Sequence, residues 1–282
     1  MKGNKIILHN IFGGTIRKLI FHKIAICLIL PVVFFCDKAK NPYENTNDPV
    51  NPAETTNVLF LSTSMVIVND LPQVFKDLAK SGGYIVHTDT NRVGTLEKQV
   101  NSQVTAEKIR KRDWDYIVLV EHSIRASVQD SCLQKMYPAA RTLDNRIKQR
   151  GAKTVFYLHI AYQKGFNDWD AGIVFSDYDT MQQALINGYI PISNELNAII
   201  SPVGFALKEI YTPGEADFWA SDGYHQNIAG QYLASCIFYA VLFKESPQGL
   251  SYKAGLPNVD ARFLQDTAAE IVLEDLERWN IE

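Results

Sequence analysis

Val58-Leu-Phe-Leu-Ser-Thr-Ser64 decides the fold, because it reads as a buried strand that ends in hydroxyl residues. A short, continuous apolar run is typical of a central strand in a parallel sheet. Four more such runs follow along the chain, with helical patterns between them. The expected strands cover 58–61, 84–87, 116–120, 154–159 and 198–203. This alternation predicts an α/β protein, a flavodoxin-like three-layer α/β/α sandwich with a mainly parallel five-stranded sheet.

The helices expected between and after these strands cover 71–80, 106–112, 132–150, 178–196, 205–210, 227–243 and 260–279. Gly82, Gly83 and Gly151 stand where a helix needs a C-terminal glycine. We find no internal repeat and no second domain boundary in the sequence. Residues 57–282 are therefore predicted to form one domain.

The second informative stretch is Asp222-Gly-Tyr-His225, far downstream of the first. A carboxylate three residues before a histidine can hold one ring nitrogen while the other ring nitrogen faces a serine. The carboxyl ends of parallel strands meet at the edge of the sheet where ligands bind, and Ser64 follows the first strand. Ser64, His225 and Asp222 are the candidate catalytic triad. Alternatively, Ser64 is a turn or cap residue, and Asp222 and His225 close a loop before a helix.

Taken with these two stretches, several other segments resemble the SGNH (GDSL-like) hydrolase superfamily, in an exported bacterial branch of unassigned function. They are Asn69-Asp-Leu-Pro, Trp114-Asp-Tyr-Ile-Val-Leu, Met181-Gln-Gln, Gly188-Tyr, Pro202-Val-Gly-Phe-Ala206 and Gly230-Gln-Tyr-Leu-Ala-Ser235. The resemblance covers roughly residues 57–250. It implies a serine esterase that works without a cofactor. Ser62-Thr63 departs from the Gly-Asn or Gly-Asp usual before the serine in that family.

The resemblance also implies an oxyanion hole, which stabilises the negative charge that develops in the transition state. It places the backbone amides of Gly94 and Ser64 in this hole, although Gly94 also reads as a turn glycine. Relatives carry a side-chain donor at the position of Val120, which has none. His122, Ser123 or a backbone amide would have to replace that donor.

Four residues near the carboxyl ends of strands are candidates for the pocket wall. Glu121, His122 and Ser123 follow the third expected strand, and His159 ends the fourth. His87 more simply packs on its strand. The sequence offers no metal site, because the histidines after the leader have no ligand spacing and no Cys-x-x-Cys occurs.

Aromatic residues cluster around the loop after the fourth strand: Tyr157, Tyr162, Phe166, Trp169 and Tyr178. They could stack on sugar rings or simply cover the edge of the sheet. We favour the covering role. Two cysteines, Cys132 and Cys236, lie in the predicted domain. Buried thiols are expected rather than a disulfide, because the two are far apart and Cys236 stands in an apolar run.

The N-terminal segment reads as a targeting sequence. Residues 1–35 carry five basic residues and no acidic one, and end in the apolar run 24–35, which suits a signal peptide better than a membrane span. Cys36 follows at once and resembles a bacterial lipoprotein acceptor, although Phe34-Phe35 replaces the small residues preferred there. Residues 36–56 form a polar, proline-containing tether. Simple secretion and a retained membrane anchor are the alternatives.

The formal charge is −3, and loss of the five leader cations makes it about −8. An acidic domain argues against nucleic acid as a partner. We therefore expect an exported, lipid-anchored serine esterase in the periplasm or at the cell surface, acting on a small acyl ester such as a glycan acetyl ester. Two alternatives remain: an inactive member of the fold that binds carbohydrate or another surface ligand, and a membrane-anchored scaffold.

Overall fold

The computed structural model describes residues 55–282 except residue 216. The predicted signal peptide, the Cys36 lipidation site and nearly all of the tether lie outside these residues. Among the residues described, no helix is long and apolar enough to span a membrane.

Five parallel strands form the main sheet, in the order β2-β1-β3-β4-β7. Their bounds are Thr56–Ser62 (β1), Val86–Arg92 (β2), Tyr116–Leu119 (β3), Lys153–Tyr157 (β4) and Ile199–Ser201 (β7). This is the flavodoxin-like order, and it confirms the predicted fold class. The chain reverses its direction of winding next to β1, so the loops after β1 and β3 flank the crevice where ligands bind in such sheets.

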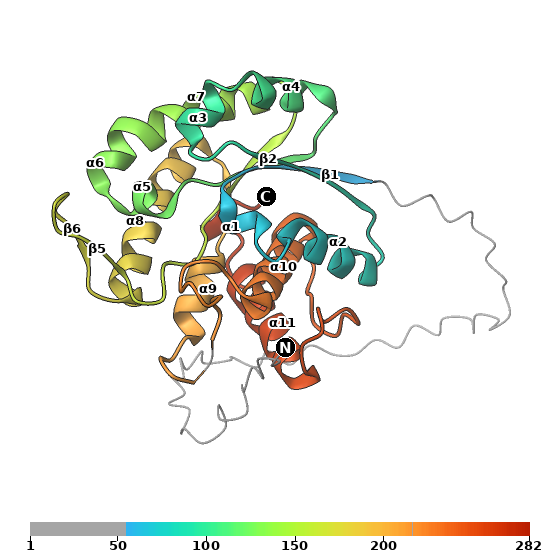
Figure 1. Ribbon diagram of the computed structural model, residues 1–282. Helices are drawn as coiled ribbons and strands as arrows, with labels where there is room; N and C mark the ends of the chain where they lie inside the picture. The colour runs from blue at the N-terminus through green and yellow to red at the C-terminus, as the bar shows by residue number, and fades with distance from the viewer. Residues whose placement is uncertain (1–54, 216) are drawn as a thin grey trace, which may run out of the picture.

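Helices cover both faces of the sheet, as Figure 1 shows. One face carries α2 (Leu71–Ser81), α10 (Ile228–Phe243) and α11 (Asn258–Leu273). The other carries α3 (Leu96–Val100), α4 (Gln103–Lys111) and α7 (Tyr137–Lys148), with α8 (Tyr178–Leu196) beside α7 and α5 (Ser123–Ser127) beside α8. The helix α9 (Val203–Ile210) contacts α8, α10 and α11.

Helix α10 lies inside the molecule, because it is packed between the sheet, α2 and α11. Its sequence is apolar on all sides, and nearly every residue in it is buried. A helix that is apolar all round is stable in water only in such a place. Asn227 begins it by accepting hydrogen bonds from the amides of Ala229 and Gly230. This cap fixes the segment directly before it, which contains Asp222 and His225.

Besides shifts of one to three residues at the ends of other elements, the observed elements differ from the predicted ones in three main places. Strand β2 runs over 86–92 rather than 84–87, since its pairing with β1 is set from Thr56↔Val86 to Ser62↔Arg92. It is an edge strand, where polar residues are tolerated. Because its residues are mostly polar, the search for apolar runs did not locate it correctly. The helix predicted over 132–150 begins as a π-helix, Cys132–Met136. The C-terminal helix ends at Leu273, and Glu277–Trp279 forms a separate 3₁₀ turn.

Several short elements have no counterpart in the prediction. They are α1 (Ser64–Ile67), α3, α5, α6 (Gln129–Ser131) and the hairpin of β5 (Phe166–Asp168) and β6 (Ile173–Phe175). Elements this short have too few residues to show a period. The two cysteines were interpreted correctly, since Cys132 and Cys236 are buried free thiols.

Candidate active site

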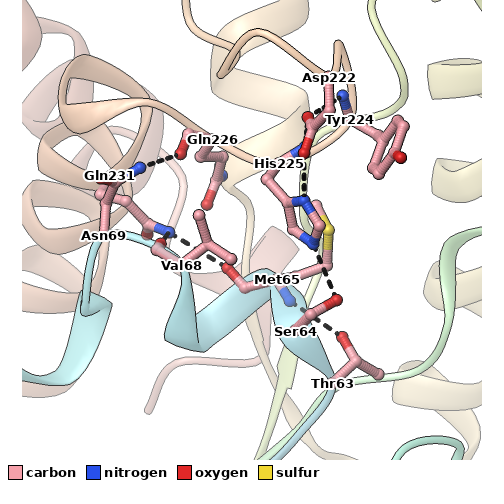
Figure 2. Close-up of polar contacts among 10 residues, drawn as sticks. All are labelled: Thr63, Ser64, Met65, Val68, Asn69, Asp222, Tyr224, His225, Gln226 and Gln231. Atoms are coloured by element: carbon pink, nitrogen blue, oxygen red, sulfur yellow. Dashed lines mark hydrogen bonds and ion pairs between the residues drawn. The ribbon is translucent and has the colours of Figure 1, made fainter.

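The structure brings Ser64, His225 and Asp222 together, although 161 residues separate the serine from the histidine. Figure 2 shows the relay: Ser64 Oγ lies 2.9 Å from His225 Nε2, and His225 Nδ1 lies 2.6 Å from Asp222 Oδ2. With the carboxylate accepting from Nδ1, the Nε2 atom is left to accept the serine proton. The geometry needed for a serine nucleophile is therefore present.

The Asp222 carboxylate is held in its charged form. Partial desolvation alone would raise its pKa, but hydrogen bonds from the His225 ring and from the amides of Tyr224 and His225 outweigh this effect. Both amides lie 3.0 Å from Oδ1. The pKa of Asp222 consequently falls below its ordinary value. The side chain of His225 is 17% exposed and that of Asp222 34%, so the pair is open to substrate yet partly shielded from water.

Ser64 owes its position to the way in which β1 ends. Thr63 is extended and begins α1, and its Oγ1 accepts from the amide of Met65. Ser64 is thus the first residue of a four-residue helix, directly above the carboxyl end of a central strand. Asn69 and Asp70 then adopt left-handed backbone with φ of 61° and 49°, and Asp70 caps α2. These two residues turn the chain sharply enough for α2 to return along the sheet.

His225 is held by a short loop that closes on itself before α10. The amide of Ala220 donates to the carbonyl of His225 at 2.7 Å, and Trp219 pairs with Gln226 as an antiparallel bridge. Gly223 has φ of 75°, a conformation that favours glycine. This turn allows the amides of Tyr224 and His225 to point back at Asp222.

Two amide side chains link the serine segment to the histidine segment. Asn69 Nδ2 donates to the carbonyl of Gln226 at 2.7 Å, and Gln231 Nε2 donates to the carbonyls of Met65 at 3.1 Å and Val68 at 2.7 Å (Figure 2). Sequence reasoning did not find this role of Gln231. A glutamine inside an otherwise apolar helix was the available signal, because a buried amide needs partners.

The two predicted oxyanion amides differ in availability. The amide of Gly94 donates to the carbonyl of Ser62 at 3.3 Å, so it is already engaged. Gly94 has φ of 107°, which fits its alternative reading as a turn glycine. Ser64 is the first residue of its helix, where an amide has no intrahelical acceptor, and it lies beside its own hydroxyl. Ser64 is the better placed donor of the two.

Val120 does not face a pocket. Its side chain is fully buried in the core, and its amide donates to the carbonyl of Leu61 at 3.1 Å. A donor introduced at this position would lie in the core rather than beside Ser64.

Of the four predicted pocket residues, three are buried, and for these the prediction is wrong. Glu121 and His159 have no exposed surface, and Ser123 is 2% exposed. The ring nitrogens of His159 face the carbonyls of Ile160 and Glu121 at 3.0 and 3.2 Å, which fixes it as a structural residue. Burial lowers its pKa. Only His122 is exposed; it lines a cavity of about 380 Å³ that also involves Thr95 and Arg125.

Glu121 joins two loops that flank the sheet edge. Its Oε1 accepts from the amide of His122 at 2.6 Å, and its Oε2 accepts from the amide of Leu96 at 3.2 Å. Burial raises its pKa to about 7, against the opposing effect of these amides and of Arg125. This buried carboxyl therefore ties the loop after β2 to the loop after β3.

The aromatic residues after β4 divide into two groups. Tyr157 and Tyr178 are buried, as the covering role predicts. Tyr162 and Phe166 are partly buried, and Trp169 is 75% exposed. Within residues 55–282, residue 216 apart, no group of histidine, cysteine or acidic side chains could hold a metal ion.

A family model described as a domain of unknown function, DUF4886, matches residues 85–271. The chain belongs to this family. No curated protein matches the chain. Among solved structures, a DUF4886 family protein from Bacteroides uniformis is 19% identical with a TM-score of 0.65, covering 78% of this chain and 95% of that chain.

Two further solved structures share the fold of this DUF4886 member. A provisionally assigned SGNH hydrolase from Slackia heliotrinireducens is 19% identical with a TM-score of 0.55, covering 67% of this chain and all of that chain. The acetyl xylan esterase AlAXEase is 12% identical with a TM-score of 0.51, covering 66% of this chain and 99% of that chain. These structures confirm the fold that the resemblance to the SGNH (GDSL-like) superfamily implies.

Proposed function

We propose that this protein is a serine esterase that hydrolyses a small acyl ester, with Ser64 as the nucleophile. The supporting observation is the continuous relay from Ser64 Oγ through the His225 ring to the Asp222 carboxylate, at 2.9 and 2.6 Å. The Asp222–His225 loop and the distant Ser64 segment meet in the order that a serine nucleophile needs. The SGNH fold makes an esterase the first reaction class to test.

In the first half of the proposed reaction, Ser64 Oγ attacks the ester carbonyl and its proton passes to His225 Nε2. Asp222 stabilises the resulting imidazolium, and the Ser64 amide donates to the oxyanion. The tetrahedral intermediate then collapses. The bond between the acyl carbon and the alcohol oxygen breaks, and His225 returns the proton to that oxygen.

In the second half, His225 removes a proton from water, and the hydroxide oxygen attacks the acyl group on Ser64. The Ser64–acyl bond breaks, the proton returns to Ser64 Oγ, and a carboxylic acid leaves. Each proton that His225 accepts is returned within the same half-reaction. The cycle therefore uses only side chains and water.

An acetyl ester on a glycan outside the cell is the substrate class that we propose. The predicted export signal supports it, because it would bring the domain to extracellular polysaccharides.

A non-catalytic protein that binds carbohydrate in the same place is the second candidate. Two observations favour it: the Gly94 amide is already bonded to Ser62, and Val120 supplies no donor to the site. Loss of one oxyanion donor costs about 10²- to 10³-fold in rate. If the protein is an esterase, we therefore expect it to be slow.

Hydrolysis of p-nitrophenyl acetate by the protein from Cys36 onwards separates the two candidates. Ser64→Ala and His225→Ala should reduce the rate to the background, and Ser62→Ala is the matched control on the same strand end. Equal background rates for all four proteins would favour the binding protein. Circular dichroism of each variant checks that it is folded.

We also propose that the protein is exported and anchored through a lipid on Cys36. Mass spectrometry of the mature N-terminus tests this. A diacylated Cys36 peptide supports the lipoprotein, whereas membrane protein that still contains Met1 supports a retained anchor. An unmodified peptide beginning after the leader would indicate simple secretion.

A further inference from the structure

A cavity of about 610 Å³ lies directly beside the triad. Its walls come from two segments, 162–167 after β4 and 221–224 in the triad loop, so Asp222 itself is part of the wall. The volume falls within the range of about 300–1,000 Å³ that small-molecule sites occupy. The cavity therefore has the size and the position of a substrate subsite.

A row of neighbouring aromatic rings extends from the wall of this cavity to the catalytic histidine. The ring centroids of Phe166 and Tyr162 are 6.1 Å apart, those of Tyr162 and Tyr224 5.3 Å, and those of Tyr224 and His225 5.1 Å. Tyr224 is 43% exposed, and Figure 2 shows its ring beside the Asp222–His225 pair. An exposed aromatic ring next to a catalytic residue offers a flat surface to a bound molecule.

A backbone hydrogen bond fixes the two walls of the cavity relative to each other. The amide of Gln163 donates to the carbonyl of Gly223 at 2.8 Å and thus joins the two walls. The site is therefore largely formed before a ligand binds, which lowers the entropy cost of binding.

Polar side chains stand between the rings. Lys164, Asn167 and Ser221 are exposed at the wall, and Gln163 is partly exposed. They offer donors and acceptors in several directions. One cation, Lys164, and one anion, Asp222, face the same cavity, so no single charge dominates. This combination suits an uncharged ligand that has both hydroxyl groups and apolar ring faces.

The chemistry of the triad indicates which half of the ester reaches this cavity. His225 gives its proton to the leaving alcohol, so the alcohol oxygen must approach His225 Nε2, whereas the acyl group stays on Ser64. Asp222, Gly223 and Tyr224 form part of the cavity wall. They come directly before His225 in the chain. The alcohol half is therefore the part of the substrate that extends into it.

We propose that this cavity, the alcohol subsite, binds a neutral sugar residue whose ring face packs on Tyr224 and Tyr162 and whose hydroxyl groups bond to Gln163 and Asn167. The proposal rests on the esterase function proposed above for its orientation. It adds the place and the residues that bind the alcohol component of the substrate. A long alkyl alcohol is disfavoured, because the amide and ammonium groups at the wall would have no partners in it.

The first experiment compares a simple acetate ester with two sugar acetate esters, using the full chain. Vinyl acetate has no sugar, whereas acetylated xylotriose and acetylated cellotriose share its acyl group and differ in the alcohol. Tyr224→Ala should lower kcat/KM for a sugar ester about threefold to tenfold more than for vinyl acetate. Asn167→Trp, which fills the cavity from an exposed position, should do the same. Ile85→Ala, an exposed apolar residue before β2, should leave both rates unchanged.

The second experiment measures binding and is independent of catalysis. Saturation-transfer NMR with unmodified xylotriose, cellotriose and N-acetylchitotriose tests the Ser64→Ala protein, alone and combined with Tyr224→Ala or Asn167→Trp. We expect at least one trisaccharide to bind at millimolar concentration, and both second substitutions to weaken it.

The two experiments separate the subsite from the esterase function. Sugar binding that depends on Tyr224, together with a wild-type protein that hydrolyses none of the acetate esters, would sustain the subsite and refute the esterase. An active esterase whose preference between sugar ester and vinyl acetate is unchanged by both Tyr224→Ala and Asn167→Trp would overturn the subsite. So would the failure of all three trisaccharides to bind.

Discussion

Glu121→Gln should remove a large part of the dependence of folding stability on pH. Glu121 is wholly buried, and its pKa rises from 4.5 to about 7 on folding. Between these two values the folded protein holds a proton that the unfolded chain has lost. The free energy of unfolding therefore falls as the pH rises through this range. Above about pH 7 the contribution of the Glu121 proton is lost.

The size of this effect follows from the shift. Each pKa unit corresponds to about 1.4 kcal/mol, so the shift is equivalent to about 3 kcal/mol between low pH and pH 8. Glutamine stays neutral at every pH, so the variant lacks this contribution. The variant also places its side-chain NH₂ group opposite the backbone N–H of Leu96 or His122. Two donors then face each other, and the lost hydrogen bond costs about 1–3 kcal/mol. That penalty does not depend on pH.

Urea unfolding at pH 4 to 8, followed by tryptophan fluorescence, measures the free energy of unfolding of both proteins. The free energy of unfolding of Glu121→Gln minus that of the wild type should rise by about 3 kcal/mol from the lowest to the highest pH. Glu107→Gln removes the same charge at an exposed position and serves as the control. Its free energy of unfolding should differ from that of the wild type by the same amount at every pH. Parallel curves for wild type and Glu121→Gln would refute the reasoning, since the carboxyl would then titrate alike in both states.

Four further predictions concern the triad and the packing around it. Asp222→Asn should lower kcat about 10⁴-fold with little change in KM, because an amide favours the wrong tautomer of His225; an activity within about tenfold of wild type would show that Asp222 does not orient the ring. Gln231→Leu should lower kcat about 10- to 100-fold by releasing the carbonyls of Met65 and Val68, and Gln248→Leu, at an exposed position, serves as its control. Gly188→Ala should destabilise the protein by about 1–3 kcal/mol in urea, because a Cβ there collides with the carbonyl of Ala126; an unchanged midpoint would contradict this. Cys132 and Cys236 should resist maleimide in the native protein and react in urea, as peptide mapping can show, because both thiols are buried and burial raises the pKa of each.

The fold could be predicted from the sequence because burial leaves a direct mark on composition. Strands β1, β3 and β4 are covered on both faces and are therefore continuous apolar runs, and α8 was predicted with its observed bounds. Edge strand β2 was misplaced because only one of its sides is paired, so its residues are free to be polar. The short hairpin of β5 and β6 has too few residues to show alternation.

The residues of the candidate triad could also be proposed from the sequence, since each follows from local features. Ser64 comes directly after a buried strand, and Asp222 stands at the spacing that lets a loop return to His225. That the two segments meet at 2.9 Å depends on the order of strands in the sheet and on the bonds from Asn69 and Gln231. These contacts join residues far apart in sequence, where no periodicity links them.

What surrounds the triad was decided by the tertiary structure alone. In the sequence, Glu121, His159 and Tyr162 all lie at or just after the ends of expected strands, at the same edge of the sheet. In the folded protein, Glu121 and His159 turn inward to satisfy buried backbone groups, whereas Tyr162 lines the cavity beside His225. The sequence determined which edge of the sheet carries polar side chains, because strand ends are visible as changes in composition. The packing of the loops after β2, β3 and β4 decided which of those side chains face solvent. These loops are packed against one another, so the position of each depends on the others.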